Sequence, residues 1–304
     1  MLRLIKNAIV FKAALPAAEH MTTHLAELPH GPLTEAQLCR TSFVPNSTTN
    51  ELVTPFEGGY SFCLRMDEKI LPTSIVRARA AERFAEAEAK MTRRLKKVER
   101  DAIREQVFLE LAKVALIKTT VVTAFYHHAE QLLVVATPSK RLAQVLIALV
   151  IKVVGSVKTE TIRISDIKHG LTTRLGNHLE GAVDNPPFGD FELGEFCELK
   201  KGSEKVSYQI SDLSTASSGL SDAIGDGFEV DRIQLTYKDV TFKLTADFHF
   251  KSVTFATELE HDEAEACDPA FIWRHEASVQ LLQFAAVVTT VCDLLGYQPP
   301  ANEA

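Results

Sequence analysis

The sequence predicts an α+β fold in which mixed or antiparallel sheets are combined with a long basic helix and a C-terminal helix. Strands and helices are expected in mixed runs, without the regular alternation of a parallel α/β protein. Residues 228–256 alternate apolar and polar side chains as an antiparallel meander does, whereas residues 74–116 and 269–296 have helical spacing. With 304 residues, 46% of them hydrophobic, the chain can bury a large core.

In the first half of the chain, the expected elements follow from these two periodicities. Leu4, Ala8, Val10 and Ala13 alternate with polar neighbours, which predicts a strand over residues 1–13. The other elements expected here are a helix over 14–28, a half-buried strand over 60–72, a helical pattern over 74–116 that is continuous or broken once, and two strands, 119–128 and 131–137, joined by a polar turn.

In the second half, turn residues mark the ends of the helices. Pro138 and Gly155 bound a buried helix, and Pro269 and Gly296 mark the start and the C-cap of the last one. The remaining elements are a strand over 158–165, short helices and loops over 168–226, and the meander. The sub-regions expected are a central sheet region (1–70 and 118–165), a long basic helical segment (71–117), a variable helical and loop region (166–226), and the meander with the C-terminal helix (227–304).

Cysteine usage and hydropathy predict a cytoplasmic protein without a membrane partner. The five cysteines are widely and irregularly spaced, as free thiols are in a reducing compartment. Lys6 and Lys12 interrupt any signal-peptide core at the N-terminus. The apolar run 145–151 is far shorter than the roughly 20 residues that a membrane-spanning helix needs.

Positive charge is concentrated in one segment of an acidic chain. The formal net charge is −7, yet residues 77–118 hold twelve Lys or Arg against seven Asp or Glu, so this segment is +5 and the remainder is −12. On a helical wheel of residues 84–104, one stripe is apolar (Phe84, Ala87, Met91, Leu95, Val98 and Ala102). The opposite stripe is cationic (Lys90, Arg93, Lys97, Arg100 and Arg104).

This cationic stripe has two interpretations. A solvated helix would pair its charges four residues apart, as in Glu86–Lys90 and Lys97–Asp101. However, such pairs account for few of the positive charges between residues 90 and 100, and an unpaired stripe suits a phosphate backbone. The segment lacks aromatic and amide side chains in a recognition pattern, so any contact with nucleic acid is expected to be indifferent to sequence.

Residues 67–116 contain, in this order, DEKILP, a long Ala/Glu/Lys helix and RRLKKVERD. This segment resembles the RdgC family of recombination-associated DNA-binding proteins of proteobacteria. The N-terminal MLRLIKNAIVFKA, the SFVP of residues 42–45 and DPAFIWRHEASVQLLQ near the C-terminus are also similar to family segments. The likeness is strong over roughly 60–160 and weak over 168–226.

The resemblance implies a homodimer closed into a ring whose positively charged hole admits duplex DNA. Such a protein binds single and double strands without sequence preference, is associated with the nucleoid, and restrains RecA indirectly by occupying DNA. Arg93, Arg94, Lys96, Lys97 and Arg100 match the family's basic stretch. With two further members of the stripe, the candidate DNA-binding residues are Lys90, Arg93, Arg94, Lys96, Lys97, Arg100 and Arg104.

Two positions depart from the family pattern. Leu116 stands where family members can carry an aromatic gate residue at a protomer contact. Ile210 and Ser211 correspond to a polar Lys-Gln pair of a second contact. We therefore expect the possible gate and dimer contacts at Leu116, Ile210 and Ser211 to be built differently, as in a diverged member or one borne by a mobile element.

No motif predicts a catalytic residue, a metal site or a cofactor. The acidic run 258–268 is typical of a solvated turn, and His20 and His24 have metal spacing without a third ligand. His127 and His128 are expected on opposite faces of a strand, and residues 222–233 fail the calcium-loop pattern. Two alternatives to DNA binding stay open, namely a metal-dependent exonuclease acting in recombination and an interaction module that docks an acidic partner.

Overall fold

The chain folds into two compact units, described here from a computed structural model. The described residues are 2–35, 37–155, 159–162, 164, 166–181, 186–210, 213, 217–256 and 268–297. The first unit comprises Met1–Glu27, Pro45–Phe62 and Val122–Ala304. The second unit comprises Leu28–Val44 and Cys63–Val121.

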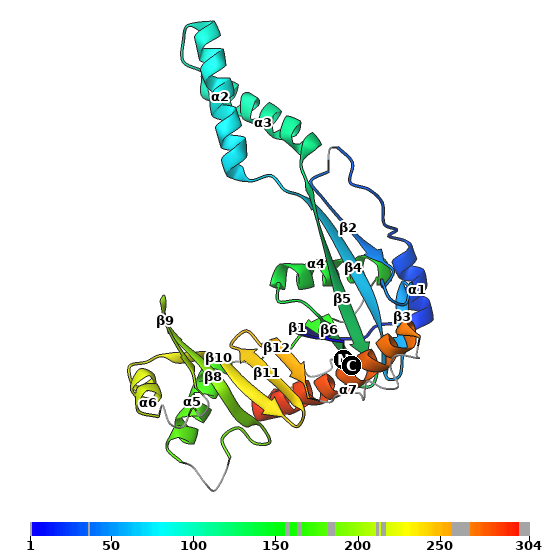
Figure 1. Ribbon diagram of the computed structural model, residues 1–304, viewed down its shortest axis with the longest axis vertical. Helices are drawn as coiled ribbons and strands as arrows, with labels where there is room; N and C mark the ends of the chain where they lie inside the picture. The colour runs from blue at the N-terminus through cyan, green and yellow to red at the C-terminus, as the bar shows by residue number, and fades with distance from the viewer. Residues whose placement is uncertain are drawn as a thin grey trace. The chain divides into compact units, whose positions relative to one another are not determined.

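The strands form an antiparallel sheet in the order β2-β4-β5-β6-β1-β12-β11-β10-β8-β9, with β3 paired to β4 and β7 paired to β1 (Figure 1). Their bounds are β1 Ala8–Ala13, β2 Cys39–Val44, β3 Val53–Phe56, β4 Gly59–Lys69, β5 Ile117–His127, β6 Leu132–Val135, β7 Thr159–Thr161, β8 Glu192–Lys201, β9 Glu204–Gln209, β10 Glu229–Tyr237, β11 Val240–Thr245 and β12 His249–Phe255. Together with the helices, this sheet confirms the predicted α+β class, and β10 to β12 confirm the predicted meander.

The core of the first unit lies between the sheet and the helices that cover it. The helices of this unit are α1 Ala18–Ala26, α4 Lys140–Val154, α5 Ile167–Leu179, α6 Ser217–Gly225 and α7 Pro269–Leu294. Inward-facing side chains of the strands, such as Val230, Ile233 and Phe250, join α5 and α7 in one buried cluster. Figure 1 shows α4 and α7 on opposite sides of β1 and β6.

The C-terminal helix α7 organises this core. Asp268 caps its start by accepting a hydrogen bond from the amide of Ala270, and Gly296 follows its end with a positive φ of 69°, as predicted. By length and composition α7 could cross a membrane, but half of its apolar stretch is buried inside the protein. Its buried Gln280 also holds the N-terminal segment, because its side chain bonds to the backbone of residues 2, 4 and 5.

The variable region of the sequence contains two strands, β8 and β9, that the pattern did not predict. In β8, the buried Cys197 and Leu199 alternate with Glu198 and Lys200, so the apolar signal is short and interrupted by charge. The strand forms because β10 and β9 pair with it on its two edges. Long-range pairing therefore decided what the local sequence left ambiguous.

The second unit contains β2, the adjoining parts of β4 and β5, and two helices, α2 Thr73–Met91 and α3 Lys97–Val114. Between its strands, the buried Asp67 accepts hydrogen bonds from Arg65 and Thr119. Burial raises the pKa of Asp67, but these two hydrogen bonds and the Arg65 charge outweigh it, so the pKa is lowered.

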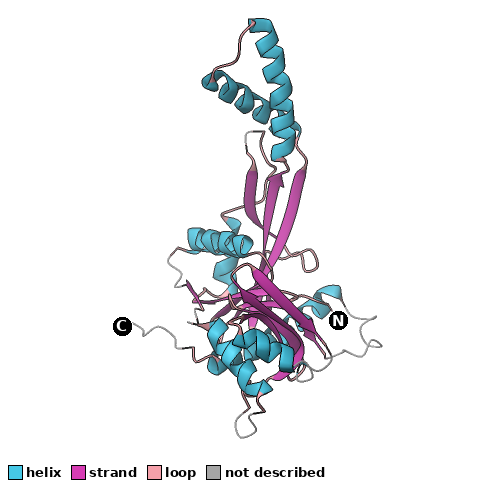
Figure 2. Ribbon diagram, turned by 90° about the vertical axis from the view of Figure 1, so that its left-hand side faces the viewer, coloured by secondary structure: helices cyan, strands magenta, loops and turns pink. Residues whose placement is uncertain are grey.

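The continuous helical wheel over residues 84–104 is wrong, because α2 and α3 form a hairpin (Figures 1 and 2). Thr92 has a left-handed conformation with φ of 52° and ends α2, and α3 begins at Lys97. Folding back buries apolar side chains of the two helices and their connection, namely Ala80, Leu95, Val107 and Ala112. A straight rod would leave these side chains without a packing partner.

Candidate nucleic-acid interface

The seven candidate cations gather around the turn of the α2–α3 hairpin. Lys90 lies in the last turn of α2, and Arg93, Arg94 and Lys96 lie in the connection. The remaining three, Lys97, Arg100 and Arg104, lie in the first two turns of α3. Residues 88–100, called the hairpin tip below, contain six Lys or Arg and two Glu, a net charge of +4.

Three of the seven are paired with carboxylates, so the unpaired stripe expected from the sequence is wrong for them. Arg93 binds Glu99 through two hydrogen bonds of 2.7 and 2.9 Å. Arg100 Nη2 lies 2.9 Å from Glu88 Oε1, and Arg104 Nη1 lies 3.1 Å from Asp101 Oδ1. The pairs with Glu88 and Glu99 join residues that only the turn brings together.

These two glutamates also build the turn. Glu99 accepts the backbone amide of Lys96 at 2.8 Å, which satisfies a free donor at the start of α3. Glu88 accepts a hydrogen bond of 3.0 Å from the backbone amide of Leu95. This bond holds the backbone of the residue whose side chain is the only buried one in the connection. The hydrogen bonds from Arg93 and then Lys96 lower the pKa of Glu99 to about 2. The amide of Leu95 and then Arg100 lower the pKa of Glu88.

Four of the candidate cations remain available for a ligand. Lys90, Arg94, Lys96 and Lys97 are exposed and have no carboxylate within 4.0 Å in the described part of the chain. They come from the end of α2, the connection and the start of α3, so they surround one end of the hairpin. This arrangement presents four positive charges on flexible side chains of a structured turn. Such charges can neutralise phosphate groups but do not distinguish one base from another.

Phe84, a member of the apolar stripe predicted from the sequence, contacts two of the three paired arginines. The guanidinium carbons of Arg100 and Arg104 lie 5.7 and 5.5 Å from the ring centroid of Phe84. This cation–π contact crosses from α3 to α2 and holds both side chains along the hairpin. The helical wheel could not show it, because it depends on the chain folding back.

The predicted gate and contact residues lie in different surroundings. Leu116 is 76% exposed just after α3, next to the exposed Val114 and Ile117. Ile210 follows β9 and is half-buried against the core of the first unit. Ser211 lies outside the described residues. That these positions contact a second protomer stays a prediction.

The described residues contain no group of three or more His, Cys, Asp or Glu side chains able to hold a metal ion. The acidic run 258–268 lies outside these residues except for Asp268. Residues 222–233, whose sequence does not match a calcium-binding loop, form the end of α6 and the start of β10. Of His127 and His128, the first is buried and the second exposed, as strand alternation predicts.

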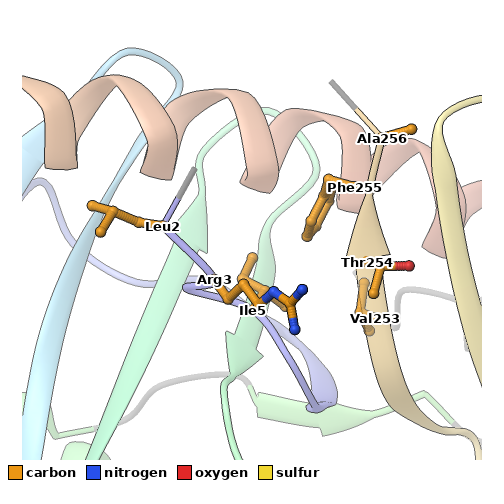
Figure 3. A pocket seen from close by; sticks show the side chains of 7 residues that line it. All are labelled: Leu2, Arg3, Ile5, Val253, Thr254, Phe255 and Ala256. Carbon is orange, nitrogen blue, oxygen red and sulfur yellow. The ribbon is translucent and has the colours of Figure 1, made fainter. Parts of the chain in front are cut away.

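A cavity of about 270 Å³ lies between the N-terminal segment and the end of β12 (Figure 3). Its lining is Leu2, Arg3, Ile5, Val253, Thr254, Phe255 and Ala256. This lining is largely apolar and contains no carboxylate, histidine or cysteine, so it offers neither a general base nor a set of metal ligands.

Comparison with known proteins agrees with the sequence resemblance. The family model described as "Putative exonuclease, RdgC" matches residues 4–298. The recombination-associated protein RdgC of Psychromonas ingrahamii is 24% identical over 287 residues, covering 91% of this chain and 92% of that protein. The protein of the same name from Shewanella loihica is 25% identical, with 96% and 97% covered. That from Neisseria gonorrhoeae is 24% identical, with 94% of each covered. The chain belongs to the RdgC family.

Proposed function

We propose that this protein binds the phosphate backbone of single- and double-stranded DNA without sequence preference and acts in homologous recombination. The observation that carries the proposal is the set of four exposed, unpaired cations at the hairpin tip of a chain whose net charge is −7. An acidic protein repels DNA on average, so binding requires positive charge to be segregated. The hairpin provides this segregation at its turn.

Phosphate neutralisation accounts for the expected lack of sequence preference. Lys90, Lys96 and Lys97 are flexible point charges, and Arg94 is free to bind a phosphate through two donors. Contacts of this kind fix the protein on the backbone but carry no information about base edges. Binding should therefore release counterions and weaken steeply with salt.

Family membership supports the assembly and the pathway. Relatives along nearly the whole chain are named recombination-associated proteins. In this proposal the protein works as a homodimer that encircles DNA, associates with the nucleoid in the cytoplasm, and restrains RecA by occupying the DNA that RecA needs. The exposed apolar group at Val114, Leu116 and Ile117 supports a contact between protomers, since apolar surface of this kind is commonly covered by a partner.

A charge-reversal variant tests the DNA-binding site. Changing Lys90, Arg94 and Lys97 together to glutamate should abolish duplex binding at moderate salt and leave the fold intact, because all three side chains are exposed and none of them pairs with the glutamates that build the turn. The matched control reverses Arg77, Lys113 and Lys118, which are exposed near the start of α2, near the end of α3 and in β5. The control has the same net charge and should bind far better. Equal binding by the two variants would contradict the proposed site.

The assembly is tested separately from DNA binding. Sedimentation equilibrium of the wild-type chain should give a dimer, and Leu116→Glu should shift it toward the monomer, since a charge at this exposed apolar group disfavours its burial. A ring predicts slower dissociation from closed circular DNA than from linear DNA of equal length. A monomeric wild-type chain would remove the ring from the proposal and leave the binding site untouched.

A second candidate function, metal-dependent exonuclease activity, is favoured by the description of the matching family model. Incubation of the purified protein with end-labelled DNA and Mg²⁺ or Mn²⁺ separates the two functions. The non-enzymatic proposal predicts DNA of unchanged length. Metal-dependent shortening that is lost when one carboxylate is substituted would overturn it in favour of the nuclease.

A further inference from the structure

The strands β8 to β12 of the first unit have two chemically different faces. One set of alternating side chains, including Cys197, Ile233 and Phe242, is buried in the core with α5 and α7. The other set is polar or charged and includes a row of cations. We call the five cations Lys200, Lys205, Arg232, Lys243 and Lys251, together with the three acids Glu192, Glu198 and Glu229 that the strand register places on the same side, the basic sheet face; its net charge is +2.

The strand register places these side chains on one face. Arg232 lies opposite Glu198, and Lys200 lies opposite Lys205 on one neighbouring strand and opposite Glu229 on the other. Glu192 lies opposite Thr236, which is on the same side of β10 as Arg232. Lys243 lies opposite Lys251 in the next strand pair. Residues directly opposite in an antiparallel ladder project to the same side, and neighbouring strands are about 4.8 Å apart. The five cations are therefore distributed over five adjacent strands of a rigid frame.

Glu198 is the centre of this face and is almost fully buried, with 6% of its side chain exposed. Its Oε1 lies 2.9 Å from Lys205 Nζ and 3.6 Å from Arg232 Nη2. Phe196, on the same side of β8, lies under two cations, with Lys243 Nζ 3.7 Å and Arg232 Cζ 6.0 Å from its ring centroid. One carboxylate and one ring thus hold three cations in place.

Charge on this face is incompletely compensated. Lys243 and Lys251 are like charges directly opposite each other, an arrangement that destabilises a sheet. Burial, and then repulsion from Arg232, lower the pKa of Lys243, while Glu198 opposes this shift. The Nε atom of Arg232 is buried without a hydrogen-bond partner. A structure that keeps such cations together gains free energy when an anion binds them.

We infer that the basic sheet face is a second phosphate-binding surface for DNA, separate from the hairpin tip. The inference rests on the proposed function, since it takes DNA as the ligand. A row of cations supplied by successive strands suits a repeating polyanion better than a single small anion, which would need its donors converging on one point. Phe196 and Glu198 are positioning residues, because they hold the cations and do not face a phosphate themselves.

The test substitutes Lys243 and Lys251, two lysines of this face that have no carboxylate within 4.0 Å among the described residues. Lys243→Gln combined with Lys251→Gln leaves the Glu198 cluster in place. We expect duplex affinity to fall about ten-fold and the slope of log K against log salt to fall by roughly 2, about one for each phosphate that the variant no longer neutralises. The matched control, Lys168→Gln with Lys238→Gln, removes the same charge from α5, which packs on the other face, and from the β10–β11 turn.

The outcomes distinguish this inference from the proposed function. If the double variant binds like its control while the hairpin-tip variant fails to bind, the second surface does not exist. If the wild-type chain does not bind DNA at low salt, the proposed function fails, and this inference fails with it. Binding of polyglutamate of matched charge, without binding of DNA, would identify an acidic protein as the partner and overturn the inference. The midpoint temperature of thermal unfolding should be the same for the double variant as for the wild type, within the difference that the control variant shows.

Discussion

The hairpin tip, with a net charge of +4, and the basic sheet face, with a net charge of +2, are supported in different ways. The tip belongs to a helical hairpin that buries few apolar side chains, among them Leu95 in the connection and Val107 in α3. The sheet face is backed by a core that includes Phe242, Phe250 and Phe284. Positive charge is thus placed once on a thinly packed hairpin and once on a rigid frame.

This difference determines how each surface can exchange its partners. At the tip, Arg93 and Glu99 are both substantially exposed, so their ion pair is weak and can give way to a phosphate. On the sheet, Glu198 is buried and cannot move away from Lys205 and Arg232 without leaving a charge unpaired. We expect the side chains of the tip to rearrange when DNA binds, and the cations of the sheet face to keep their positions.

The largest effect should come from the core behind the sheet face. Phe284→Ala removes a fully buried ring that packs 5.0 Å from Phe250, centroid to centroid, and should lower the free energy of unfolding by about 3–5 kcal/mol. Urea denaturation measures this loss. Phe271→Ala, where the ring is 60% exposed, is the control and should change stability by less than about 0.5 kcal/mol. Equal losses would show that burial of the Phe284 ring is not what stabilises the core.

The hairpin should respond locally and by a smaller amount. Leu95→Ala removes the buried side chain of the connection and should lower the free energy of local opening by about 2 kcal/mol, the lower end of the range for such substitutions. Amide hydrogen exchange should accelerate in α2 and α3 and remain unchanged in α7. Val98→Ala, at a 79% exposed position, should leave exchange unaffected. Acceleration throughout the chain would contradict an independently opening hairpin.

Releasing an arginine at the tip should strengthen DNA binding slightly. Glu99→Gln removes the charge that holds Arg93, and we expect duplex affinity to rise roughly two- to five-fold. Glu105→Gln removes the same charge from an exposed position of α3 and separates this effect from the change in net charge. If both variants bind equally well, competition between Glu99 and phosphate is not significant.

The smallest effect is a pH dependence of stability in the first unit. Burial lowers the pKa values of His127 and His249 below the ordinary 6.5. The unfolded chain therefore binds protons that the folded chain does not, and stability should fall as pH decreases through 6.5 toward the folded values. His127→Asn should flatten this slope in urea titrations between pH 7 and 5, and His20→Asn, at an exposed position, should not. A slope unchanged by His127→Asn would assign the acid sensitivity elsewhere.

The sequence was sufficient for elements whose periodicity is long and regular. The meander over 228–256 and the helix starting at Pro269 were predicted because alternation and helical spacing persist over many residues. The break after Met91 was not located, because no Gly or Pro marks it. Its signal was weaker, an acidic Glu99 three residues after Lys96, which is typical of a helix N-terminus.

The sequence predicted which residues belong to the site but not how they are arranged in space. Seven cations could be listed from their clustering, but the ion pair of Arg100 with Glu88 spans twelve residues and exists only because the hairpin closes. The basic sheet face was missed because Lys205, Arg232 and Lys243 are far apart in the sequence. Charges that face one another across strands become neighbours only through strand register, which depends on the whole fold.

The most direct test of the account is the salt dependence of DNA affinity for the wild-type chain on two duplexes of unrelated sequence. Fluorescence anisotropy between about 50 and 300 mM salt should give parallel straight lines of log K against log salt, with a slope near 0.9 for each phosphate neutralised. Affinities for the two sequences should agree at every salt concentration. An affinity that is insensitive to salt, or that differs strongly between the two sequences, would contradict binding through the phosphate backbone.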